Sequence, residues 1–140
     1  MTTPNYTSAQ FRSILNGWGY RQKTQADGPN FPVSQDNSAL TDAPTVEAIK
    51  SFQREYQLKD DGIVGPITRD KAAQVVSSLQ LELNKCVKAG IPDNQPFYGP
   101  QTVTAVKQFQ QKIKVSQDGI ASNALRLKLY DLFKSGACPL

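Results

Sequence analysis

The sequence contains the same nineteen-residue string twice. Residues 45–63, TVEAIKSFQREYQLKDDGI, return without a gap at 102–120 as TVTAVKQFQQKIKVSQDGI. Nine of the nineteen positions are identical, where ordinary residue frequencies would give about one by chance. Each copy has the pattern of a short amphipathic helix followed by an Asp-Gly turn, which is too little structure to bury an apolar face alone. The chain is therefore a duplication, and we expect its two halves to pack on each other.

Apolar residues recur at helical spacing along most of the chain. A first helix follows the capping box Thr7 to Gln10, others cover about 43–57 and 100–114, and a last one follows Ser122. Neither Gly nor Pro interrupts residues 67–89, and an apolar stripe crosses the repeat boundary there. This segment is predicted to form one long central helix of about 22 residues that both repeats share. Alternating strand patterns are nearly absent, so the sequence predicts an all-α fold.

The predicted domain organisation follows the repeat. Residues 1–74 form the first repeat, residues 75–140 form the second, and the shared helix fuses them into one compact body. Residues 20–41 are polar and interrupted by Gly and Pro, so they are predicted to form a long loop that the second repeat lacks.

The repeated string also carries a family resemblance. In the first repeat a helix ending in Phe-Gln leads to DGIVGPIT at 61–68, and this arrangement resembles the bacterial peptidoglycan-binding domain, a small three-helix cell-wall module. The second repeat keeps YGPQT at 98–102 and the Asp-Gly-Ile at 118–120, but residues 122–125 are SNAL where the family has Gly-Pro-x-Thr. The resemblance implies two three-helix bundles in tandem, of which the second is degenerate.

Candidate ligand-binding residues come from two sources. The resemblance implies a groove beside the Phe-Gln helix and its loop, formed here by Phe52, Gln53, Tyr56, Asp61, Gly62, Val64, Gly65 and Thr68. Two tyrosines in predicted loops, Tyr20 and Tyr98, are added because sugar rings stack on aromatic faces. Gln110 is added as the counterpart of Gln53. A partly buried amide needs hydrogen-bond partners, and either the adjacent turn or a ligand can supply them.

The chain has no histidine. It therefore lacks Ser-His and Cys-His nucleophile pairs and any zinc site that needs a His ligand, and its carboxylate pairs lie in turns or on helix surfaces. We predict no enzyme activity, no catalytic residue, no metal site and no cofactor. The net charge of +4 comes from scattered Lys and Arg, so no nucleic-acid partner is predicted. No apolar run approaches the roughly 20 residues of a membrane span.

The sequence alone does not decide the cellular compartment or whether the two cysteines form a disulfide. The N-terminal residues have no basic residue before Arg12 and no apolar stretch typical of a signal peptide. This favours a cytoplasmic protein or one exported by another route, with the cell wall as destination if the resemblance sets the function. Cys86 and Cys138 fit either a disulfide or two free thiols.

The leading interpretation is a non-catalytic module that binds peptidoglycan through its glycan or its stem peptide. An alternative is an intracellular protein-protein interaction module or structural subunit of a larger assembly that uses the same fold. A third is a fragment of a phage-type lysin whose catalytic domain lies elsewhere.

Overall fold

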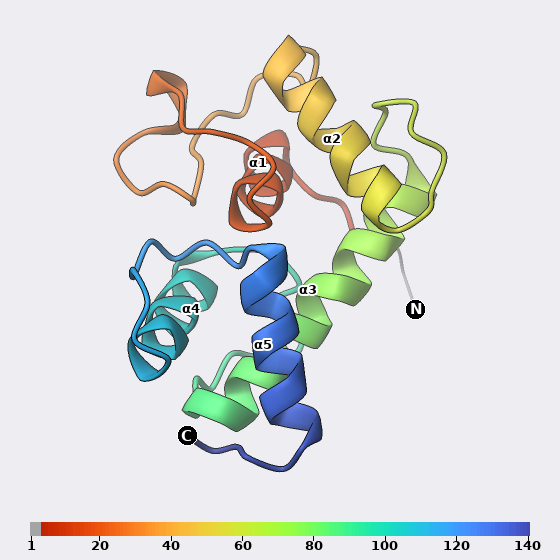
Figure 1. Cartoon of the computed structure of the whole chain (residues 1–140). Helices are drawn as coiled ribbons and strands as arrows, with labels where there is room; N and C mark the ends of the chain where they lie inside the picture. Colours follow the sequence, from red (N-terminus) through yellow and green to blue (C-terminus); the bar gives the residue numbers. More distant parts are fainter. Residues whose placement is uncertain (1–3) are drawn as a thin grey trace.

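The computed structural model describes residues 4–140, and this part of the chain is helical without a strand. It contains five α-helices and one short 3-10 helix: α1 (Ser8–Gly17), η1 (Gln25–Asp27), α2 (Ala43–Glu55), α3 (Pro66–Val87), α4 (Pro100–Lys112) and α5 (Asn123–Lys134). Figure 1 shows α1 and α2 beside one end of α3, and α4 and α5 beside the other. The all-α prediction is confirmed.

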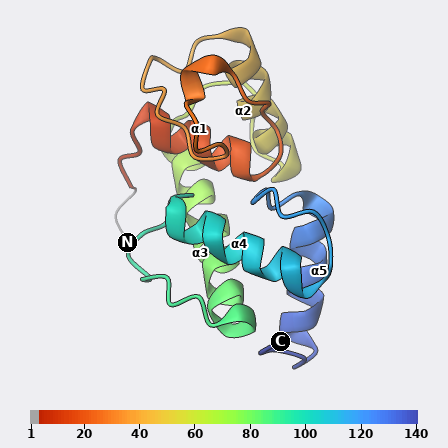
Figure 2. The ribbon, with the colours of Figure 1, turned by 90° about the vertical axis from the view of Figure 1, so that its left-hand side faces the viewer.

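Helix α3 is the long central helix that the sequence predicted. It has 22 residues, begins with Pro66 after Gly65, and ends where Lys88 takes a left-handed φ of 54°. Figure 2 shows it passing behind α4 from the first repeat into the second. Its buried side chains recur every three or four residues and face both repeats; they are Thr68, Ala72, Ala73, Val76, Leu79, Gln80, Leu83 and Cys86.

The helix starts follow local sequence signals. Thr7 Oγ1 accepts a hydrogen bond of 3.0 Å from the Gln10 N–H, and Gln10 Oε1 accepts one of 2.9 Å from the Thr7 N–H. This capping box satisfies backbone donors that the first turn of α1 leaves free. Asp42 and Ser122 cap α2 and α5 in the same way with their side-chain oxygens.

The two repeats meet around Tyr98. Its ring packs against Gly17 so closely that a Cβ added there would lie 2.5 Å from the ring, and it meets Trp18 edge to face. The Tyr98 hydroxyl donates a hydrogen bond of 2.6 Å to the Gly119 carbonyl oxygen. Tyr98 is 1% exposed, so the expectation that it faces a ligand from its loop is corrected. The side chain serves as an interior contact between the repeats.

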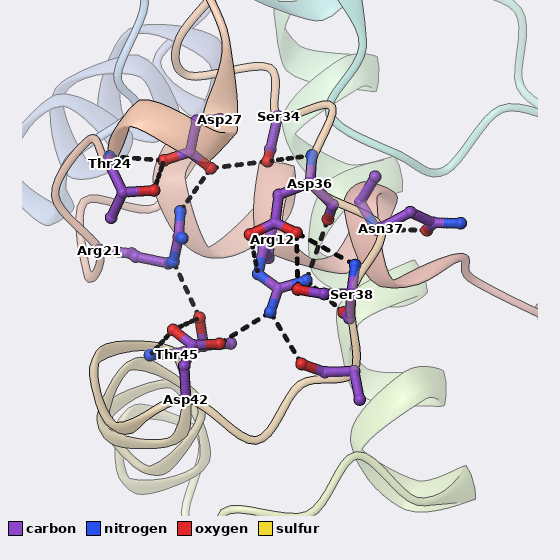
Figure 3. A network of polar contacts seen from close by, with 12 residues as sticks. Arg12, Arg21, Thr24, Asp27, Ser34, Asp36, Asn37, Ser38, Asp42 and Thr45 are labelled. Atoms are coloured by element: carbon purple, nitrogen blue, oxygen red, sulfur yellow. Dashed lines mark hydrogen bonds and ion pairs between the residues drawn. The ribbon is translucent and has the colours of Figure 1, made fainter.

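Two buried arginines that the sequence analysis did not single out hold the long loop (Figure 3). Arg12, on α1, is 0% exposed, and its guanidinium donates to the carbonyl oxygens of Asp36, Ser38 and Ala39 and to the Asp42 carboxylate. Because these acceptors lie along the loop and at the start of α2, one side chain fixes the loop to both helices.

Arg21 anchors the other part of the loop. It donates to Asp27 Oδ1 at 2.7 Å and to Thr45 Oγ1 at 2.9 Å, and both charged side chains of the Arg21–Asp27 pair are buried. Burial alone would raise the pKa of Asp27, but hydrogen bonds from Ser34, Thr24 and Arg21 hold that pKa below its usual value. The loop is therefore an ordered part of the first repeat.

The two cysteines form a disulfide. Cys86, near the end of α3, is bonded to Cys138 in the C-terminal tail, and the Leu140 N–H donates a hydrogen bond of 2.8 Å to the Cys86 carbonyl oxygen. Of the two states that the sequence left open, the structure contains the bridged one.

Candidate functional site

The Asp-Gly turn after α2 is held by the side-chain amide of Gln53. This side chain is 1% exposed, and its Oε1 accepts a hydrogen bond of 3.0 Å from the Gly62 N–H. Its Nε2 lies 3.1 Å from Asp61 Oδ1, from the Ile63 carbonyl oxygen and from Thr68 Oγ1. The amide thus joins the turn to the first turn of α3. The sequence allowed either the adjacent turn or a ligand to supply the hydrogen-bond partners of this amide. In the structure the turn supplies them.

The turn itself has requirements that only some residues meet. Gly62 has a φ of 73°, in the left-handed region that favours glycine, and a Cβ there would lie 2.9 Å from Val46 Cγ1. The Ile63 N–H donates to Asp61 Oδ1 at 3.0 Å, and this bond, with one from Gln53, holds the pKa of Asp61 below its usual value. The Asp61 carboxylate is therefore ionised at neutral pH.

Gln110 repeats this arrangement after α4. It is 3% exposed, its Oε1 accepts from the Gly119 N–H at 2.9 Å, and its Nε2 lies 2.7 Å from Asp118 Oδ1. The contact to a hydroxyl is missing because Leu125 stands where the first repeat has Thr68. The sequence departure in the second repeat thus removes one hydrogen bond and leaves the turn intact.

Each turn borders a surface pocket in an equivalent position. The first turn pocket has a volume of about 200 Å³ and is lined by Leu58, Lys59, Asp61, Ile63, Gly65, Pro66, Ile67 and Thr68. The second turn pocket has a volume of about 480 Å³ and is lined by Gln110, Ile113, Val115, Ser116, Asp118, Ile120, Ser122, Ala124, Leu125 and Lys128. Six of the first pocket's eight residues have counterparts 57 positions later that differ in size or polarity. One of these changes is at Ile67, where the second repeat has the smaller Ala124, and the second pocket has the larger volume.

The structure brings only some of the predicted site residues to these pockets. Asp61, Gly65 and Thr68 line the first, and Gln110 lines the second. Phe52, Gln53 and Gly62 are buried beneath the first turn and support it from inside. Val64 and Tyr20 are partly buried against the core, and Tyr56 lies in a different depression between the repeats.

Two exposed isoleucines stand out among the residues of the first turn pocket that the sequence did not predict. Ile63 is 67% exposed and Ile67 is 72% exposed, although both are large apolar residues. A signal was available, because Ile67 lies off the buried stripe of α3 that begins with Thr68 and Ala72. An isoleucine outside the stripe, beside a turn, has no core position to occupy and indicates an apolar surface.

Residues 4–140 contain neither a metal-binding cluster nor a helix able to span a membrane. No group of three or more His, Cys, Asp or Glu side chains there is arranged to hold a metal ion. Within the same residues, no helix has the length and apolar character needed to cross a membrane.

Comparison with known families agrees with the repeats. A family model described as "Putative peptidoglycan binding domain" matches the chain twice, at residues 9–71 and 73–129. The two matches together cover most of the chain, and each includes one copy of the helix and the Asp-Gly turn. No curated protein and no solved structure matches the chain significantly.

Proposed function

The chain belongs to the peptidoglycan-binding domain family, and we propose that it binds cell-wall peptidoglycan without catalysis, through the two turn pockets. The observation that carries this proposal is the repetition of the site. Both repeats hold an Asp-Gly turn with a buried glutamine amide and place a pocket directly beside it. Two rigid surfaces of one kind, built from one duplicated sequence, support a recognition role.

The chemistry of the first turn pocket suits a polymer of acetylated sugars and short peptides. Ile63 and Ile67 offer exposed apolar surface to acetyl and alanyl methyl groups. Asp61, whose carboxylate stays ionised, and Lys59 offer polar groups to hydroxyls and amides at the same rim. A small open pocket of this kind supports weak binding, because it covers only part of a ligand.

The second turn pocket suits a more apolar part of the same polymer. Leu125 replaces a hydroxyl, and Val115, which is 48% exposed, lies at its rim. In Figure 1 the loop after α2 and the loop after α4 lie on different sides of the molecule. We therefore expect the two pockets to engage separate wall strands, so that a dense wall raises the apparent affinity above that of one pocket.

Sedimentation with purified sacculi tests this proposal. Ile67→Ser and Val115→Ser should each weaken binding about fivefold, because each removes apolar contact area worth on the order of 1 kcal/mol. The double variant should weaken binding further than either single variant. Leu81→Ser is the matched control, because Leu81 is an apolar residue of α3 that is 62% exposed and lies outside both turn pockets.

The disulfide supports a location where peptidoglycan is present. Bridged cysteines persist mainly in oxidising compartments outside the cytosol. If the wild-type protein fails to sediment with sacculi under conditions where a wall-binding control protein does, the proposal is wrong. An intracellular assembly partner recovered from the native host would then favour the interaction-module alternative.

A further inference from the structure

A third depression, distinct from the turn pockets, lies between the two repeats. This inter-repeat groove has a volume of about 420 Å³ and is formed by the ends of α1 and α2, the middle of α3 and the start of α5. Its wall includes the apolar side chains of Leu127 and Tyr130, which are 57% and 47% exposed. Because both repeats contribute side chains, the groove exists only in the duplicated chain.

Two of the charged side chains in the inter-repeat groove are matched within the protein. Arg126 forms two contacts with the Glu55 carboxylate, at 2.5 and 3.2 Å, and its guanidinium lies 4.7 Å from the centre of the Trp18 ring. Lys71 Nζ donates to Gln74 Oε1 at 3.0 Å. The Arg126–Glu55 pair joins α5 to α2 across the groove, whereas Lys71 is hydrogen-bonded only to an uncharged amide.

Glu82 is the carboxylate of the groove that has no ion-pair partner among the described residues. Its side chain lines the groove and is partly buried, and within residues 4–140 it belongs to no ion pair shorter than 4.0 Å. When Leu15-Asn16 is aligned with Leu83-Asn84, Glu82 is the second repeat's equivalent of Ile14. Ile14 is 0% exposed in the first repeat. A carboxylate therefore occupies a position that the other repeat uses for its core.

We propose that the inter-repeat groove binds the ammonium-bearing side chain of a peptidoglycan stem peptide, with Glu82 as its counter-charge. The source of the ligand rests on the proposed function, whereas the site is separate from the turn pockets. The methylene groups of the ligand's amine side chain would lie on Leu127 and Tyr130, and the ammonium would meet the carboxylate. Lysine and diaminopimelate side chains share this chemistry.

The electrostatics of the groove support this occupant. Burial raises the pKa of Glu82 to about 7, so the carboxylate loses hydration without gaining a partner. An ammonium group would favour the ionised form and remove that disadvantage. A partly buried charge without a partner reduces stability, and such groups gather at sites where a ligand completes the pairing.

The test uses a synthetic tripeptide, L-Ala-γ-D-Glu-L-Lys, and its Nε-acetylated form. Binding is followed by NMR at the indole N–H of Trp18, the chain's one tryptophan, which lines the groove. The wild type should bind the free amine about tenfold more tightly than the acetylated form, the order expected of a charge-assisted contact. Glu82→Gln should bind both forms with the weaker affinity.

Glu47→Gln is the matched control, because Glu47 is an exposed carboxylate of α2 outside the groove. It should retain the tenfold preference for the free amine. Equal affinity of the wild type for the two peptides, or an unchanged preference in Glu82→Gln, would overturn the inference. If the wild type sediments with sacculi but does not distinguish the peptides, this inference fails and the proposed function stands. If the wild type distinguishes the two peptides but does not sediment with sacculi, the proposed binding through the turn pockets is wrong and the inference on the groove stands.

Discussion

Replacing either buried glutamine with alanine should destabilise the whole domain. In Gln53→Ala, the Gly62 N–H loses its acceptor, and Thr68 Oγ1 loses the amide 3.1 Å away. In Gln110→Ala, only the Gly119 N–H and the turn oxygens lose their partner, because no hydroxyl is present there. Both variants keep the helix, since alanine is a good helix former.

The size of the effect follows from the hydrogen bonds lost. A buried donor left without an acceptor costs about 1 to 3 kcal/mol, and truncation of a buried side chain adds a cavity term. We expect Gln110→Ala to lower the free energy of unfolding by about 2 kcal/mol. Gln53→Ala should lower it by about 3 kcal/mol, because it leaves one more polar group unsatisfied.

Urea unfolding followed by circular dichroism measures the difference, provided that the slope with denaturant is the same for all variants. Gln108→Ala is the matched control, because Gln108 is an exposed residue of α4. It should change the free energy of unfolding by less than about 0.5 kcal/mol. If both test variants also stay within that margin, the amides do not hold the turns, and the assignment of Gln53 and Gln110 as structural supports is wrong.

Four further changes test other parts of the structure. Asp27→Asn leaves the buried Arg21 guanidinium without a counter-charge and should cost about 3 to 5 kcal/mol of stability, measured by urea unfolding. Reduction of the disulfide, whose cysteines are 52 positions apart, should cost up to about 4 kcal/mol by the loop-entropy estimate, seen as a lower Tm in dithiothreitol. Gly62→Ala should lose about 1 to 2 kcal/mol because of its positive φ, whereas Gly65→Ala, with open space around it, should change the Tm by little. The pKa of Glu82 is raised to about 7, so the folded state favours the protonated carboxyl. The stabilisation that the protonated Glu82 contributes is therefore greatest below about pH 4 and is lost as the pH rises through 7. Glu82→Gln should therefore raise the Tm at pH 8 and leave it unchanged at pH 4.

Helix positions and turns could be predicted because their signals are local. The stripe of α3, the capping box at Thr7 and the repeated Asp-Gly turn each depend on residues a few positions apart. The predicted segment 67–89 differs from the observed Pro66–Val87 by no more than two residues at either end. The duplication strengthened each signal, because a pattern that occurs twice is less subject to chance.

Burial inside loops could not be predicted, because it depends on contacts between distant residues. Tyr98 lies in an irregular segment, and only the absence of a side chain at Gly17 creates the space for its ring. Arg12 lies on α1 among apolar residues, but its acceptors are carbonyl oxygens more than twenty positions away. Neither contact leaves a periodic pattern, so the sequence predicted a ligand contact for Tyr98 and indicated no role for Arg12.

The junction between the repeats uses side chains whose counterparts in the second repeat are different. Glu55 of the first repeat pairs with Arg126 of the second, but the residue equivalent to Glu55, 57 positions later, is Lys112. The alignment that pairs Asn16 with Asn84 also places Cys86 where the first repeat has Trp18. Trp18 packs on Tyr98 of the second repeat, whereas Cys86 is bonded to Cys138. The inter-repeat groove therefore depends on residues that differ between the repeats, whereas the two turn pockets depend on the string that the duplication repeats.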